Sequence, residues 1–214
     1  NAFQPGSEMD ARLQSIKDPD PRMVNKMKES RIKTLKPDEI GYLNISNFKQ
    51  DGLVANAKTV ETILEVTLAK PILPHSKTTF TLDFDGQVPV QIRRSGRNNA
   101  EGIELSMAQW YPKMAEFDFE GWHADPYIAR EFHGVWGNFD VKITIDKEYV
   151  LGGSGYLQNK NEIGHGYQDA GIKVMYPKNT KALTWHFYAP MVHDFTWAAD
   201  KNYLHDVVKG PNGV

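Results

Sequence analysis

The stretch Phe139-Asp140-Val141-Lys142-Ile143-Thr144-Ile145 places an apolar residue at every second position. Successive side chains of a β-strand point to opposite faces, so this alternation predicts a strand with one buried and one solvated face. The same period of two recurs over residues 64–68, 80–84 and 183–188. Strands with one solvated face are typical of antiparallel sheets, and these four segments therefore predict antiparallel pairing.

Turn-forming residues separate the predicted strands, for example Asp51-Gly52, Asp85-Gly86 and Gly152-Gly153. No helical pattern of ten or more residues follows residue 40. Many short strands with turns between them are typical of a sandwich or barrel. We therefore predict an all-β fold, an antiparallel β-sandwich. Further strands are expected over residues 40–48, 88–93, 103–108, 171–176 and 195–199.

Residues 1–39 have a different character from the rest of the chain. Ser7 is a suitable N-cap for a short helix that runs to about Lys17, with Met9, Leu13 and Ile16 on one face. Prolines at positions 19 and 21 end that helix. We predict a peripheral, partly ordered arm over residues 1–39 and a single β-sandwich domain over residues 40–214.

Composition excludes several classes of function. The 214 residues carry a net charge of −2, so no basic field draws nucleic acid. No uncharged apolar run approaches the roughly 18 residues that a membrane-spanning helix needs. The chain has no cysteine, which removes disulfides, thiol catalysis and thiolate zinc sites. We expect neither a nucleic-acid partner nor a membrane span.

Aromatic residues are concentrated between positions 110 and 139. This segment holds Trp110, Tyr111, Phe117, Phe119, Trp122, Tyr127, Phe132, Trp136 and Phe139, nine of the 24 aromatic residues in the chain. One interpretation is a shaped ligand surface, because large rings bury area at little entropic cost and stack on sugars or side chains. The other is a long crossover whose aromatic side chains fill the gap between two sheets.

Four acids lie in or beside this segment: Glu116, Glu120, Asp125 and Glu131. Glycoside hydrolysis needs a pair of carboxylates, one as acid and one as base or nucleophile. A small glycosidase that uses Glu116 or Glu131 is therefore a further, weaker hypothesis beside the two classes of function given below. The ordinary alternative is a solvated acidic rim.

The histidines do not form a recognisable metal motif. Seven are present, and none takes part in an H-E-x-x-H or H-x-x-E-H sequence. We expect no metal site and no catalytic zinc in this chain. Arg93, Arg94 and Arg97 form a small basic cluster that could bind an anion or pair with acids, or simply occupy a solvated turn.

Several motifs resemble one protein family in the same order. They are SMAQWYPKM (106–114), GWHADPY (121–127), EFH (131–133), GNFDVKITI (137–145), TWHFYAP (184–190) and VHDFTWA (192–198). Together they resemble the N-terminal β-domain of the aminopeptidase N family of zinc metallopeptidases, in the bacterial branch with a QWYP motif that is common in proteins of Bacteroidetes type. The resemblance covers about residues 40–205.

The resemblance implies a saddle-like, non-catalytic β-sandwich domain that lacks its first strands and stops before the catalytic domain. In such enzymes the zinc lies in that next domain, which is the implied partner, and the N-terminal domain lends a polar loop to the pocket for the peptide's amino end. Gln109 matches the first position of the loop motif. Tyr111 replaces the usual second acid or amide, and a phenol supplies no negative charge at neutral pH. The branch is often exported, so an extracytoplasmic home is expected.

Two classes of function follow. The leading one is the non-catalytic domain of a zinc peptidase, in which Gln109 and Tyr111 contact the peptide substrate. In a regular strand these two side chains would share a face, with Trp110 on the other. The alternative is a free-standing β-sandwich that binds carbohydrate or peptide through its aromatic residues.

Overall fold

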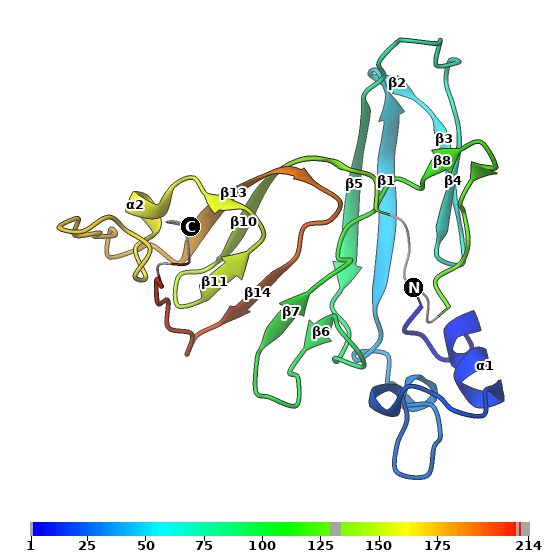
Figure 1. The fold of residues 1–214 in the computed structure, drawn as a ribbon, viewed down its shortest axis with the longest axis horizontal. Helices are drawn as coiled ribbons and strands as arrows, with labels where there is room; N and C mark the ends of the chain where they lie inside the picture. Colours follow the sequence, from blue (N-terminus) through cyan, green and yellow to red (C-terminus); the bar gives the residue numbers. More distant parts are fainter. Residues whose placement is uncertain (1, 129–133, 209, 211–214) are drawn as a thin grey trace. The chain divides into compact units, whose positions relative to one another are not determined.

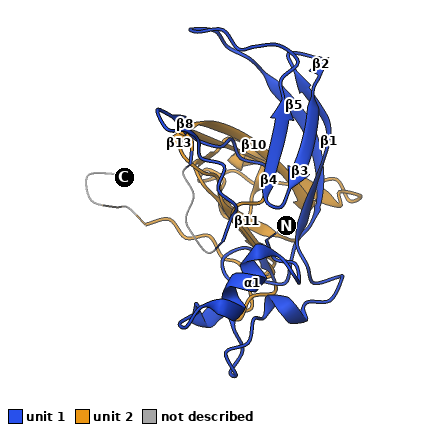
Figure 2. Cartoon of the chain, turned by 90° about the vertical axis from the view of Figure 1, so that its right-hand side faces the viewer, with its two compact units in different colours: residues 1–97, 111–134 blue, residues 98–110, 135–214 orange. Residues whose placement is uncertain are grey.

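The computed structural model describes residues 2–128, 134–208 and 210. These residues are predominantly β, with antiparallel strand pairs and little helix, so the predicted all-β class is confirmed. The chain forms two compact units (Figure 2), of which unit 1 comprises residues 1–97 and 111–134 and unit 2 comprises residues 98–110 and 135–214. This division differs from the single domain predicted over residues 40–214.

Unit 2 is built around the longest strands of the chain. Its first sheet has the order β10-β13-β12, and in a second sheet β14 pairs with β11 on one side and with β7 on the other. All but β12 of the following elements are labelled in Figure 1. They are β7 (Leu105–Met107), β10 (Gly137–Asp146), β11 (Val150–Gly153), β12 (Tyr156–Leu157), α2 (Lys160–Ile163), β13 (Ala182–Val192) and β14 (Trp197–Asp200).

The two sheets of unit 2 share one hydrophobic core, which gives this unit its sandwich-like packing. Strand β13 contributes Leu183, Trp185, Phe187 and Ala189, all buried, while the residues between them face outward. Strands β11 and β14 contribute Leu151 and others from the second sheet. The alternation predicted for residues 183–188 is therefore confirmed residue by residue.

Unit 1 holds the N-terminal segment and the remaining strands. Its main sheet has the order β2-β1-β5, and two hairpins, β3–β4 and β8–β9, accompany it. The elements are α1 (Glu8–Ser15), the 3-10 turns Pro21–Met23 and Ile32–Thr34, β1 (Tyr42–Gln50), β2 (Leu53–Val54), β3 (Asn56–Val60), β4 (Ile63–Thr67), β5 (Phe80–Gln87), β6 (Gly96–Arg97), β8 (Phe117–Asp118) and β9 (Gly121–Trp122). Neither α1 nor α2 has the length or apolar character of a membrane-crossing helix.

The N-terminal arm is more than peripheral. The Ser7 hydroxyl caps α1 by accepting the Asp10 N–H, as its sequence position predicts. The arm then buries Met9, Leu13, Met23 and Ile32, which form a second core cluster within unit 1. Isolated apolar residues such as Met23 and Ile32 have no periodicity, because short 3-10 turns carry them. Residues 1–39 therefore contribute buried side chains to unit 1, and the domain boundary at residue 40 stays a prediction.

Two predicted strands are wrong. Residues 88–93 form only an isolated bridge at Val90, and Pro89 has no N–H to donate to a ladder. Residues 171–176 have no strand partner. There Gly171 has a positive φ of 85°, and the Tyr176 hydroxyl donates a hydrogen bond to the Ile163 carbonyl. In this segment Val174 and Tyr176 are half-buried and Ile172 is exposed, so its apolar alternation accompanies neither a backbone ladder nor a fully buried face.

A phenol–carboxylate pair makes the stability of unit 2 vary with pH in the alkaline range. The Tyr149 hydroxyl donates to Glu104, whose N–H donates to Asp200 Oδ2 at 3.0 Å. The hydrogen bond to Glu104, then burial, then the charge of Glu104 raise the pKa of Tyr149 to about 12. The folded state thus favours the protonated phenol, whereas an unfolded tyrosine titrates near 10.

The stabilisation by Tyr149 is therefore complete below pH ~10 and is lost as pH rises toward ~12. We expect Tyr149→Phe to flatten the fall in unfolding free energy between these pH values, measured by urea denaturation at each pH. Tyr156→Phe, at an exposed tyrosine of the same unit, is the control. An unchanged alkaline slope in Tyr149→Phe would contradict this account.

Candidate functional site

Gln109 lies just after β7 in a left-handed backbone conformation, with φ of 55°. A residue with a Cβ pays roughly 1–3 kcal/mol for such a conformation, and such residues cluster where the surrounding structure fixes a turn. The side chain is half-buried. Because this backbone is not that of a regular strand, the alternation expected over residues 109–111 does not hold.

Trp110 fixes the end of this segment in unit 2. Its indole N–H donates to the Phe195 carbonyl at 3.1 Å, and its ring packs edge-on against Trp197 with 6.2 Å between centroids. Phe195 is fully buried. Trp110, the residue next to Gln109, is therefore anchored on the core of unit 2.

Tyr111 begins the second segment of unit 1 and is half-buried. The ammonium nitrogen of Lys113 lies 6.0 Å from the centroid of its ring, within the range of a cation–π contact. Sequence patterns gave no sign that the Gln-Trp-Tyr motif crosses from one compact unit to the other.

The aromatic segment does not behave as one surface. Trp110 and Phe139 pack on the core of unit 2. In contrast, Phe117, Phe119, Trp122 and Trp136 are 61%, 94%, 63% and 64% exposed. Phe132 lies outside the described residues. The interpretation as a crossover with packed aromatic side chains thus fits Trp110 and Phe139. The interpretation as a ligand surface fits the exposed rings of the β8–β9 hairpin.

Three potential metal ligands meet at the β8–β9 hairpin. The donor atoms of Asp118, Glu120 and His123 lie within 4.8 Å of one another. An imidazole and two carboxylates could hold a divalent cation. They also form a salt-bridged group without one, because His123 Nε2 lies 2.8 Å from Asp118 Oδ2. This hydrogen bond is the main cause that raises the pKa of His123.

The acids proposed for glycoside hydrolysis differ in their exposure to solvent. Glu116 is half-buried, and its carbonyl accepts the His123 N–H at 2.9 Å. Glu120 and Asp125 are exposed, while Glu131 lies outside the described residues. No catalytic carboxylate pair can be assigned among the described members of this set.

The arginine cluster has structural roles within unit 1. Arg93 lies 3.3 Å from Asp20 Oδ2, and its guanidinium donates to the Tyr127 hydroxyl at 2.9 Å. Arg97 donates to the Asp38 carbonyl at 2.6 Å. Hydrogen bonds from Arg22 are the main cause that holds the pKa of Asp20 well below its usual range, with a smaller contribution from the charge of Arg93. The interpretation as a solvated turn does not apply to Arg93.

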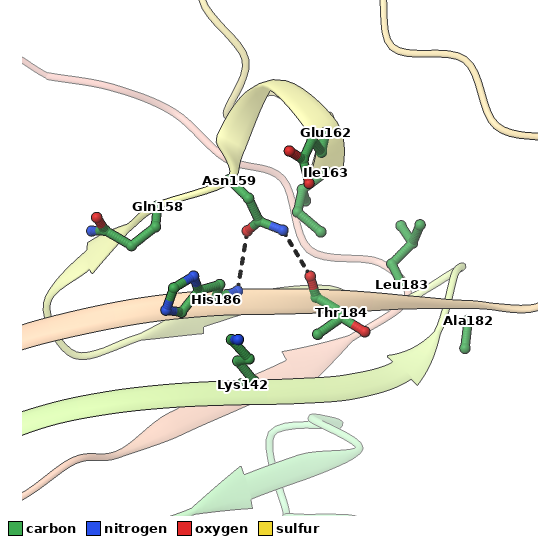
Figure 3. A pocket seen from close by; sticks show the side chains of 9 residues that line it. All are labelled: Lys142, Gln158, Asn159, Glu162, Ile163, Ala182, Leu183, Thr184 and His186. Atoms are coloured by element: carbon green, nitrogen blue, oxygen red, sulfur yellow. Dashed lines mark hydrogen bonds between the residues drawn. The ribbon is translucent and has the colours of Figure 1, made fainter.

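A cavity of about 580 Å³, lined by both polar and apolar side chains, lies in unit 2 beside β13 (Figure 3). The Asn159 side chain bridges the Thr184 carbonyl and the His186 N–H, and His186 Nε2 lies 3.0 Å from Asp140. The lining residues are Lys142, Gln158, Asn159, Glu162, Ile163, Ala182, Leu183, Thr184 and His186. Sequence patterns missed it because α2 and β13 meet only in the folded chain.

Comparisons of the chain with protein-family models, with curated proteins and with solved structures found no match. The case for a function therefore depends on the motifs of the sequence and on the geometry described above.

Proposed function

We propose that this chain is the non-catalytic N-terminal domain of a zinc metallopeptidase of the aminopeptidase type. In this proposal it covers the catalytic domain of the same polypeptide and contributes Gln109 and Tyr111 to the pocket that holds the amino end of a peptide. The zinc belongs to the catalytic domain, and this chain holds no cofactor.

The conformation of Gln109 is the observation that carries the proposal. A left-handed, half-buried glutamine stands between a strand end and an anchored tryptophan. Such a turn fixes the position and direction of the Gln109 side chain. A side chain that recognises a ligand must be held in this way. An amide oxygen is a suitable acceptor for the N–H groups of a peptide's ammonium end. The motif resemblance independently selects the same residue.

Tyr111 modifies this recognition. Its phenol oxygen can accept one hydrogen bond but carries no charge at neutral pH. The Lys113 ammonium near its ring adds a positive charge to the same surroundings. We therefore expect a weaker preference for a free amino end than in family members with an acid at this position.

The 214-residue chain by itself is expected to have no peptidase activity, because it has no H-E-x-x-H to hold zinc and activate water. Aminoacyl-anilide and peptide hydrolysis measured with added zinc should equal the buffer blank, and elemental analysis after dialysis should find no stoichiometric zinc. Chelator-sensitive hydrolysis by the pure chain would overturn the proposal.

The parent polypeptide provides the positive test. Its coding sequence should encode an H-E-x-x-H downstream of residue 214, and the purified product should hydrolyse peptides in a zinc-dependent manner. A parent without that motif and without hydrolysis would leave the free-standing binding module as the better explanation.

A further inference from the structure

The β8–β9 hairpin combines exposed aromatic rings with an excess of acidic side chains. Residues 114–125 contain four acids and no lysine or arginine. Phe119 at the turn is 94% exposed, and Phe117 and Trp122 on the two strands are more than 60% exposed. Met114 adds a fourth exposed apolar side chain. Clustered apolar exposure of this kind marks a surface that is covered in a larger assembly.

The hairpin is held in one conformation before any partner binds. The Phe117 and Trp122 rings pair across the strands with 4.9 Å between centroids. On the neighbouring positions, the Asp118–His123 ion pair and the hydrogen bond from the Glu120 N–H to Asp118 hold the turn. A preorganised surface loses little conformational entropy on association, so the exposed rings are suited to binding.

We infer that the β8–β9 hairpin docks into a protein surface with an apolar recess rimmed by lysine or arginine. The projecting Phe119 ring fills the recess, and the carboxylates of Glu120 and Glu116 face the basic rim. Such charge complementarity directs association and excludes acidic surfaces, including anionic membranes. The inference rests on the proposed function, in which this recess belongs to the peptidase part of the parent polypeptide.

Hydroxyl-radical footprinting of two proteins tests the docking: the 214-residue chain and the parent polypeptide. We expect oxidation of Phe119 and Trp122 to be about tenfold slower in the parent, as for residues in the buried centre of an interface. Leu73 and Met27 of the same unit, which are 67% and 76% exposed, serve as internal controls. Equal oxidation of Phe119 in both proteins would overturn the inference.

Charge reversal tests the chemistry of the recess. In the parent, Glu120→Lys should restore Phe119 oxidation to the rate seen in the 214-residue chain. The matched control is Glu101→Lys, at an exposed acid in the turn before β7, and it should leave the protection unchanged. Protection that survives Glu120→Lys would show that the covering surface is not basic and would overturn that part of the inference.

Three further outcomes distinguish a failure of this inference from a failure of the proposed function. If added maltohexaose or chitohexaose protects Trp122 in the 214-residue chain, the hairpin binds carbohydrate and protein docking is wrong. If the parent hydrolyses peptides while Phe119 stays exposed, the docking inference fails and the proposed function stands. If Phe119 is protected in a parent that hydrolyses no peptide, the proposed function fails while a basic docking partner remains.

Discussion

Replacement of Trp185 by alanine is expected to destabilise unit 2 by about 3–5 kcal/mol, the usual loss for a large buried aromatic side chain. Trp185 is fully buried on β13. Its ring stacks with His165 at 5.9 Å and meets Tyr167 edge-on at 5.6 Å between centroids. Domains are typically stable by only about 5–15 kcal/mol, so this loss brings unit 2 close to unfolding.

Urea denaturation followed by near-ultraviolet circular dichroism measures the effect, and Trp136→Ala is the matched control. Trp136 is 64% exposed, and its described ring contact is an edge-on one with His193 at 5.2 Å. An exposed truncation of this kind usually changes stability by less than about 0.5 kcal/mol. Equal losses in the two variants would show that β13 does not form the centre of the core.

Phenylalanine at position 185 separates packing from polarity. The Trp185 indole N–H is buried and has no hydrogen-bond acceptor among the described residues. Trp185→Phe removes this donor, whose burial costs about 1–3 kcal/mol, while it keeps part of the ring volume. We therefore expect a much smaller loss for Trp185→Phe than for Trp185→Ala in the same denaturation series.

The sequence was most informative where one side chain in two enters a core. In β13, the residues Leu183, Trp185 and Phe187 are buried and their neighbours face outward, so a period of two located the strand and its buried face. The N-cap of α1 was also predictable, because a local hydrogen bond from Asp10 to Ser7 determines it. Local patterns of this kind need no information about distant parts of the chain.

Features that depend on distant contacts were not predictable. Met23 and Ile32 are buried by the fold of unit 1 without any periodic pattern around them. The assignment of residues 98–110 to unit 2 depends on the pairing of β7 with β14, about 90 residues later in the chain. For the candidate site, the motif selected Gln109, but the left-handed backbone that positions it could not be inferred from alternating hydrophobicity.

If the parent polypeptide is the proposed peptidase, Gln109→Ala is expected to lower its catalytic efficiency roughly tenfold to a hundredfold. In the proposed pocket, the amide accepts a hydrogen bond from the amino end of the substrate, and its removal leaves a buried donor unpaired at a cost of about 1–3 kcal/mol. Steady-state hydrolysis of a peptide with a free amino end measures the change. The 214-residue chain should lose little stability in denaturation, because no substrate contact exists there.

Three variants identify the origin of that loss. Glycine accepts the positive φ of Gln109 without strain, so Gln109→Gly tests the backbone. If the amide is responsible, Gln109→Gly and Gln109→Ala lose equal activity, whereas recovery in Gln109→Gly would indicate backbone strain in the alanine variant. Gln158→Ala, at an exposed amide of unit 2, should retain full activity.

Tyr111→Phe removes only the phenol oxygen, and a fall in activity for free amino ends alone would assign that oxygen to the same pocket. Full activity in Gln109→Ala and Tyr111→Phe together would exclude this segment from the substrate site, and only a covering role for the domain would remain.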